Sequence, residues 1–133
     1  MEKHFIAHLL ENEAFKEKNY GKALEDTMLL LDHIMCSDEG IKELAEIYAL
    51  CPKDEGDDGS PKKKSKDAMT AKNCGTTATV VIVTPDEIIC SNTGDSRTIM
   101  CQDGEAIQLS EDHRPEDEAE TERINKAGVK VIG

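Results

Sequence analysis

Residues 73–97 read NCGTTATVVIVTPDEIICSNTGDSR, in which two apolar runs are separated by turn-forming residues. The first run, residues 76–83, is rich in β-branched residues, and the second spans residues 88–90. Thr84-Pro-Asp-Glu87 lies between them and supplies turn chemistry, because proline presets φ and aspartate hydrogen-bonds to its own backbone. The pattern predicts an antiparallel β-hairpin.

Two further turns extend this pattern toward the C-terminus. Asn92-Thr-Gly-Asp95 precedes a third expected strand, residues 98–101. Gln102-Asp-Gly-Glu105 contains the Asp-Gly pair typical of tight hairpins and precedes a fourth expected strand, residues 106–109. We therefore expect an antiparallel meander of four strands.

Three short motifs occur in order along these strands: Gly75-Thr-Thr-Ala78, Gly94-Asp-Ser-Arg97 and Asp112-His-Arg-Pro115. In residues, order and spacing they resemble motifs of the metal-dependent Ser/Thr protein phosphatases, the protein phosphatase 2C family. One such tetrapeptide is an ordinary turn sequence, whereas three in order with matching strands between them are specific. The resemblance implies an α+β fold, a partial β-sandwich of two antiparallel sheets flanked by helices in αββα layers.

The resemblance also divides the chain into three parts. Residues 1–50 resemble the helical part of the phosphatase domain, and residues 51–72 form a charged, flexible insert. Residues 73–133 contain the β-meander, an acidic helix and the start of the segment that the family calls the flap. Within the family, residues 12–47 most resemble the gamma-type members.

The first fifty residues predict helices, because apolar residues recur there at helical spacing in two groups. The groups are Phe5, Ile6, Leu9 and Leu10, and then Leu24, Met28, Leu31 and Met35. Asn19-Tyr-Gly21 is expected to separate two helices. Ser37-Asp-Glu-Gly40 is expected to cap a third, short helix over residues 41–49.

The family's remaining metal-binding motifs have no counterpart in this sequence. An Asp-Gly-His-Gly-Gly motif is expected before the helix that includes Glu2, and Asp-Gly-X-X-Asp and Asp-Asn motifs are expected beyond Gly133. The resemblance implies that the chain is an interior portion of a catalytic domain. We expect this portion to be inactive by itself.

The function implied by the resemblance is dephosphorylation of phosphoserine and phosphothreonine proteins. In the family, water activated at a binuclear Mg²⁺ or Mn²⁺ centre attacks the phosphorus directly. The alternative is a non-catalytic, phosphatase-like module that binds or regulates other proteins. Flanking sequence that supplies or lacks the remaining metal-binding aspartates would separate the two.

Asp95 is the residue that we connect most closely with this chemistry. The resemblance implies that it lies near the binuclear centre and helps to hold a third, more weakly bound metal ion, for which a carboxylate is a suitable ligand. The residues alone allow a second role, in which Asp95 caps the turn by accepting backbone N–H bonds. Arg97 is expected to pair with Asp95 or, in the interpretation that we favour, to anchor neighbouring loops through several hydrogen bonds.

The adjacent Asp112 and His113 suggest a general-base pair. Neighbouring residues on an extended segment point to opposite faces, however, so we favour a structural role for both. In the family the general acid is the histidine of a motif without a counterpart here, so no catalytic residue is assigned. The resemblance implies that Arg114 lies beside the flap and contacts the substrate phosphopeptide.

Composition limits the remaining function classes. A formal net charge of −12 argues against nucleic acid as the main partner. No apolar run approaches the roughly 20 residues that span a bilayer, so no membrane partner is expected. The five cysteines are odd in number and lack Cys-X-X-Cys spacing, which indicates neither a disulfide framework nor a zinc site. These features favour a cytoplasmic or nuclear location.

Two groups of polar residues have both an ordinary and a functional interpretation. The first group is a basic run that comprises Lys62, Lys63, Lys64 and Lys66. It is either a nuclear-import signal or part of a solvated loop whose positive charges balance the acidic residues before it. His4 and His8 have helical spacing but lack the neighbouring glutamate of zinc-binding helices, so we interpret them as part of a helix face.

Overall fold

The structure is a computed structural model that describes residues 2–50 and 74–131. The chain divides into two compact units, Met1–Gly75 and Thr76–Gly133. Helices and antiparallel strands are both present, which confirms the predicted α+β class. The predicted insert, residues 51–72, and the basic run within it lie outside the described residues.

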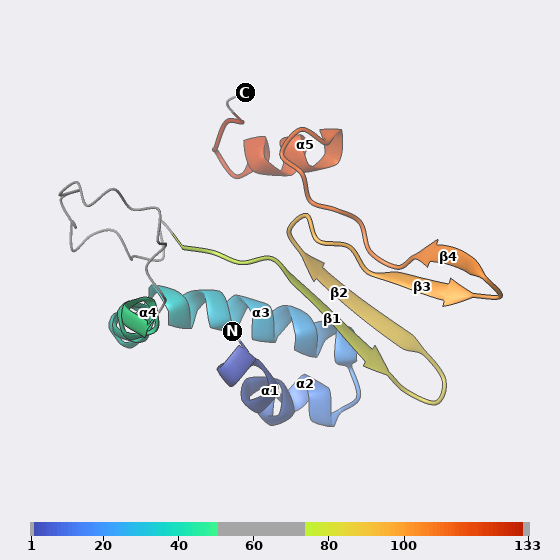
Figure 1. Ribbon diagram of the computed structural model, residues 1–133, viewed down its shortest axis with the longest axis horizontal. Coiled ribbons are helices and arrows are strands. Elements are labelled where there is room, and N and C mark those ends of the chain that lie inside the picture. Colours follow the sequence, from blue (N-terminus) through green and yellow to red (C-terminus); the bar gives the residue numbers. More distant parts are fainter. Residues whose placement is uncertain (1, 51–73, 132–133) are drawn as a thin grey trace. The chain divides into compact units, whose positions relative to one another are not determined.

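The described part of the first unit is helical (Figure 1). Its elements are α1 (Glu2–Glu11), α2 (Glu13–Lys16), α3 (Tyr20–Cys36) and α4 (Asp38–Leu50). Helix α3 contacts each of the other three, so it forms the centre of the unit. The buried apolar side chains are Phe5, Leu9, Ala23, Leu24 and Leu31.

Asparagine caps place the helix boundaries in this unit differently from the prediction. The side chain of Asn12 accepts a hydrogen bond from Ala14 N at 2.8 Å, so α2 begins there as a separate short helix that was not predicted. The side chain of Asn19 accepts from Lys22 N at 3.4 Å, and α3 begins at Tyr20. Gly21 therefore lies in the first turn of α3 instead of separating two helices.

The predicted cap at Ser37 is confirmed. Ser37 Oγ accepts a hydrogen bond from Gly40 N at 3.1 Å and donates one to Ile34 O at 2.7 Å. Helix α4 begins at Asp38, earlier than the predicted start at Ile41. Gly40 permits the tight turn between α3 and α4, because a Cβ there would collide with the carbonyl oxygen of Ile34.

The first helix buries only part of its predicted apolar face. Phe5 and Leu9 are buried, whereas Ile6 and Leu10 are 59% and 54% exposed. His4 lies on α1 and pairs with Glu43 of α4, with 2.9 Å between His4 Nε2 and a carboxylate oxygen. His4 also stacks on His8, which confirms their place on one helix face.

The second unit contains two hairpins and one helix (Figure 1). Its elements are β1 (Ala78–Val83), β2 (Ile88–Thr93), β3 (Ile99–Gln102), β4 (Glu105–Gln108) and α5 (Glu118–Lys126). Strand β1 pairs antiparallel with β2, and β3 pairs antiparallel with β4.

Both predicted hairpin turns are confirmed. Thr84 N donates to Glu87 O at 2.9 Å, and Thr84 Oγ1 accepts from Glu87 N at 3.1 Å, which closes the turn between β1 and β2. Asp103 and Gly104 have φ values of 53° and 85°, the left-handed pair that a tight hairpin between β3 and β4 requires.

The predicted continuous meander is wrong in one connection. The strands form two separate two-stranded sheets, so β2 is not paired with β3 within the described residues. The physical reason lies in residues 94–98, whose polar groups bond to the segment after β4. His113 N donates to Gly94 O at 2.9 Å, and Thr98 N donates to Ser110 Oγ at 2.8 Å.

The acidic helix is present as α5, with Glu118 and Glu120 in its first turn, where carboxylates suit the helix dipole. Gly128, at φ 83°, ends it. In the part of the chain that the structure describes, no helix combines the length and apolar character needed to cross a bilayer.

Candidate functional site

The turn after β2 and the segment after β4 hold each other through Gly94 and His113. Gly94 N donates to His113 Nδ1 at 3.4 Å, and His113 N donates to Gly94 O at 2.9 Å. The side chain of Asn92 donates to Gly94 O at 3.0 Å and to Glu111 O at 2.6 Å. These contacts join two segments that are 19 residues apart in sequence.

The role of Asn92 was not predicted. Its amide nitrogen makes both bonds, while its Oδ1 is buried without a hydrogen-bond partner among the residues described. A buried polar group left unsatisfied costs free energy, and this cost opposes the gain from the two bonds that the nitrogen makes. The only sequence signal was the position of Asn92 beside a glycine turn.

Thr77 supports the same turn from the start of the first hairpin. Gly94 has φ 99°, and a Cβ built on it would lie 2.5 Å from Thr77 Cγ2. Thr77 Oγ1 and Ser96 Oγ are hydrogen-bonded at 2.7 Å. Glycine is therefore required at residue 94 both for its backbone conformation and for its contact with Thr77.

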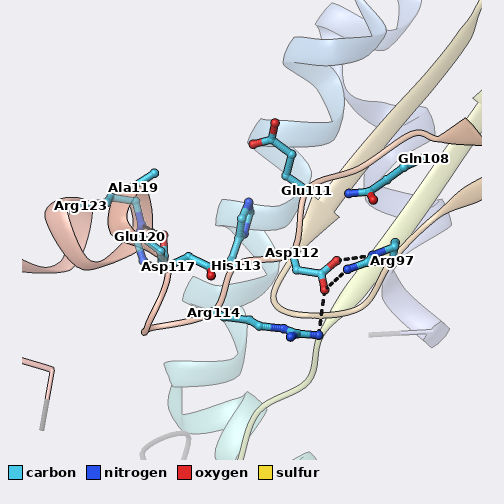
Figure 2. A pocket seen from close by; sticks show the side chains of 10 residues that line it. All are labelled: Arg97, Gln108, Glu111, Asp112, His113, Arg114, Asp117, Ala119, Glu120 and Arg123. Atoms are coloured by element: carbon cyan, nitrogen blue, oxygen red, sulfur yellow. Dashed lines mark hydrogen bonds and ion pairs between the residues drawn. The ribbon is translucent and has the colours of Figure 1, made fainter. Parts of the chain in front are cut away.

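Arg97 and Arg114 converge on Asp112, as the dashed lines in Figure 2 show. Arg97 binds it in a bidentate manner, with Nε on Oδ1 and Nη2 on Oδ2, both at 2.9 Å. Arg114 Nη2 lies 3.1 Å from Oδ2. The Asp112 side chain is only 8% exposed, whereas the two arginine side chains are about half exposed.

The electrostatics follow from this geometry. The hydrogen bonds from Arg97 are the largest cause that holds the pKa of Asp112 below its usual range, and the charges of Arg97 and Arg114 add to them. The same hydrogen bonds raise the pKa of Arg97. Asp112 is therefore an anion clamped between two cations.

Two of the structural interpretations are confirmed by this arrangement. Arg97 anchors a loop through Asp112 and does not pair with Asp95. The Asp112 carboxylate binds arginines, while the His113 ring accepts a bond from Gly94, so Asp112 does not orient His113. The partner of Arg97 lies 15 residues away in sequence, and no local pattern in the sequence predicted it.

Unlike Gly94, Ser96 and Arg97, Asp95 is not hydrogen-bonded to another segment of the described chain through its side chain. Its side chain is exposed and has no hydrogen-bond or ion-pair partner anywhere in residues 2–50 and 74–131. The turn-capping role is therefore not seen, because Asp95 accepts no backbone N–H bond there. Its carboxylate is available to an external ligand.

A cavity of about 560 Å³ adjoins the arginine cluster (Figure 2). Arg97, Asp112 and Arg114 line it on one side, and Glu120 and Arg123 of α5 line it on the other. Asp95 is not one of the described residues that line it, so the two predicted site residues, Asp95 and Arg114, do not face one common pocket.

The residues present fit one part of a metal site. A hard divalent cation accepts carboxylate oxygens and keeps several waters, so an untied, exposed aspartate such as Asp95 suits it as a single ligand. Within the described stretches, no three histidine, cysteine, aspartate or glutamate side chains gather at metal-binding distance. Asp95 can therefore contribute one ligand but does not amount to a site by itself.

The family model for protein phosphatase 2C, described as "Protein phosphatase 2C", matches residues 2–133. Among similar proteins, "Probable protein phosphatase 2C 2" of Paramecium tetraurelia is 34% identical over 128 residues, which cover 96% of this chain and 37% of the relative. "Protein phosphatase ppm-1.G" of Caenorhabditis elegans is 50% identical over 63 residues, or 47% of this chain and 13% of the relative.

A plant protein shows the same pattern of coverage. "Probable protein phosphatase 2C 58" of Oryza sativa subsp. japonica is 31% identical over an alignment that covers 95% of this chain and 39% of the relative. The chain thus spans between a third and two fifths of the relatives that it matches along nearly its whole length. With a family match that extends over residues 2–133, the chain belongs to the protein phosphatase 2C family.

Proposed function

We propose that the whole protein carrying this sequence is a divalent-cation-dependent protein-serine/threonine phosphatase, and that Asp95 supplies one of its metal ligands. The observation that carries the proposal is the contrast at the Gly94-Asp-Ser-Arg97 turn. Its neighbours are tied by hydrogen bonds to two other segments, while the Asp95 carboxylate is exposed and untied among the described residues. Family membership supports the reaction class.

The proposed substrates are phosphoserine and phosphothreonine proteins, and the proposed cofactor is Mg²⁺ or Mn²⁺. Such ions, when bound, supply positive charge to phosphoryl oxygens and lower the pKa of water. Asp95 offers a negatively charged oxygen ligand on a turn with few degrees of freedom. Little ordering of the turn is then needed when the ion binds.

Arg114 is the proposed contact for the substrate phosphate. It is half exposed and forms one ion pair with Asp112 through Nη2, and it also lines the cavity. A guanidinium is well suited to phosphate because its parallel N–H groups match two oxygens. The shared Asp112 limits the orientations that Arg114 can take.

The metal role of Asp95 is tested by comparing Asp95→Ala and Asp95→Asn with the unmodified whole protein. We expect turnover of a phosphothreonine peptide to fall more than the affinity for the two tightly held metal ions, because Asp95 would bind the weaker, third ion. Steady-state rates and Mn²⁺ titrations measure both quantities. Unchanged turnover in both variants at saturating Mn²⁺ would contradict the metal role.

The substrate role of Arg114 has its own test. Arg114→Ala is expected to raise KM for a phosphothreonine peptide about tenfold, the size of one lost charge-assisted contact, with a smaller effect on kcat. Arg114→Lys keeps the charge and should recover only part of the loss. If the whole protein binds phosphopeptide but hydrolyses none, the non-catalytic module becomes the better description.

We also propose a cytoplasmic or nuclear location. In the described part of the chain, Cys36, Cys74, Cys90 and Cys101 are free, as thiols in a reducing compartment usually are. Imaging of the tagged whole protein tests this location. Secretion into the medium would contradict it.

A further inference from the structure

The strongest feature that the proposed function does not use is the Asp112 carboxylate. It is 8% exposed in an otherwise open segment and accepts three hydrogen bonds or ion-pair contacts from two guanidinium groups. A carboxylate is rarely buried to this degree unless cations surround it. Arg97, Asp112 and Arg114 form what we call the clamp. It has a definite geometry, which a loose surface ion pair lacks.

The clamp reaches the Asp95 turn from its C-terminal side. Arg97 lies two positions after Asp95, and its bidentate bond to Asp112 fixes both the position and the plane of the guanidinium. On the N-terminal side, Gly94 is bonded to the backbone and ring of His113, the residue next to Asp112. One short segment, residues 112–113, thus holds the turn at the residue before Asp95 and at the second residue after it.

We infer that Asp112 is a positioning residue for Asp95, which it orients through Arg97. The inference rests on the proposed function, because it presumes that Asp95 binds a divalent cation. In this proposal Asp112 acts through Arg97 and is not itself a ligand of the cation. It removes the freedom of the turn to rotate the Asp95 carboxylate away from the ion, and groups that orient metal ligands typically change metal affinity by about 10- to 100-fold.

A double-mutant cycle tests the inference in the whole protein, with Mn²⁺ alone as the titrant. Arg97→Lys keeps a positive charge but loses the bidentate geometry, and Asp112→Asn keeps the shape but loses the negative charge. Each is expected to weaken the weaker class of Mn²⁺ sites about tenfold. The double variant should be no weaker than either single variant, since both remove the same contact.

The second bidentate pair lining the cavity provides a matched control. Arg123 binds Glu120 through Nε and Nη2 at 2.7 and 2.6 Å within α5, and no hydrogen bond or ion pair among the described residues joins this pair to residues 94–97. Glu120→Gln and Arg123→Lys should leave the Mn²⁺ affinity unchanged. An equal loss in these controls would show a general charge effect and would overturn the inference.

Asp95→Asn serves as the reference that separates the inference from the function on which it rests. If Asp95→Asn leaves Mn²⁺ binding unchanged, the proposed metal role fails, and the inference fails with it. If Asp95→Asn weakens binding but Asp112→Asn and Arg97→Lys do not, or if their effects simply add, only the positioning role of Asp112 is wrong.

Discussion

At the scale of single residues, the organising feature is a rigid turn around one untied carboxylate. Gly94 is bonded on both of its backbone groups, Ser96 is bonded to Thr77, and Arg97 is bonded to Asp112. Ordering a residue costs about 1 to 2 kcal/mol of backbone entropy, and here that cost is met when the fold forms. A ligand that binds Asp95 therefore does not have to order the backbone of the turn.

A first prediction concerns Gly94. Gly94→Ala should destabilise the whole protein more than Gly104→Ala. Both glycines have positive φ, which costs an alanine about 1 to 2 kcal/mol, but only Gly94 has a neighbour that the new Cβ would meet. That contact with Thr77 should add about 1 to 3 kcal/mol, as overpacking does. Thermal unfolding of the two variants measures the difference.

A suppressor variant identifies the cause of the Gly94 effect. Thr77→Ser removes the methyl group that lies nearest to the new Cβ and keeps the hydroxyl that bonds to Ser96. It should recover part of the stability lost in Gly94→Ala. Equal destabilisation by Gly94→Ala and Gly104→Ala, with no recovery, would show that the Thr77 contact does not matter.

A second prediction concerns the pH dependence of Asp112. Its pKa is lowered in the folded state, so its stabilising contribution is present above the unfolded pKa of about 3.9 and is lost as the pH falls through the folded value. The stability difference between the unmodified protein and Asp112→Asn should be constant near neutral pH and shrink below about pH 4. Denaturant unfolding over this pH range measures it, and a difference that stays constant down to pH 2 would contradict the prediction.

At the scale of elements, the sequence predicted the local structures that depend on neighbouring residues. The two hairpin turns and the cap at Ser37 were found because their residue types have direct conformational preferences. The pairing of β2 with β3 was wrongly predicted, because it depended on whether residues 94–98 would bond to a distant segment. Hydrogen bonds across 15 or 19 residues, such as those of Arg97 and Asn92, leave no local pattern in the sequence.

A third prediction belongs to the junction of α3 and α4. Ser37→Ala should lower the free energy of unfolding by about 1 kcal/mol, because it removes the cap on Gly40 N and the bond to Ile34 O. Ser37→Thr keeps the hydroxyl and should recover most of the loss. Denaturant unfolding of the whole protein measures both variants, and equal stabilities for alanine and threonine would rule out the capping role.

At the scale of the whole molecule, the sequence predicted the family and the fold class better than it predicted the arrangement of the site. Sequence motifs identified the family. Of the residues in those motifs, the structure places Arg97, Asp112, His113 and Arg114 around one cavity and leaves Asp95 outside it. A two-metal site holds its ions with several carboxylates, and one exposed aspartate supplies a single ligand. The roles of Asp95 and Arg114 therefore stay predictions.

A fourth prediction follows for the 133-residue chain by itself. It should show no Mn²⁺-dependent hydrolysis of a phosphothreonine peptide, since a two-metal site takes carboxylates from several segments and Asp95 is the single ligand that we propose here. The control is Asp95→Asn in the same chain, which should give the same background rate. Hydrolysis that requires Mn²⁺ and disappears in Asp95→Asn would contradict this expectation.

A fifth prediction concerns how this chain unfolds by itself. All of the buried apolar side chains in the described residues lie in the helical unit, while the hairpins expose several of theirs. Val81, Val83, Ile88 and Ile99 are 42%, 71%, 48% and 62% exposed. Two-stranded sheets with uncovered apolar faces are marginal in water and have free edges that favour aggregation.

We therefore expect the isolated chain to unfold over a broad temperature range and to form soluble aggregates. Replacing Val83 and Ile99 by threonine keeps β propensity and removes exposed apolar surface, so this variant should aggregate less without becoming more cooperative. Calorimetry and light scattering measure the two properties. A sharp two-state transition of a monomer would show that the hairpins are stabilised by contacts other than those of the described residues.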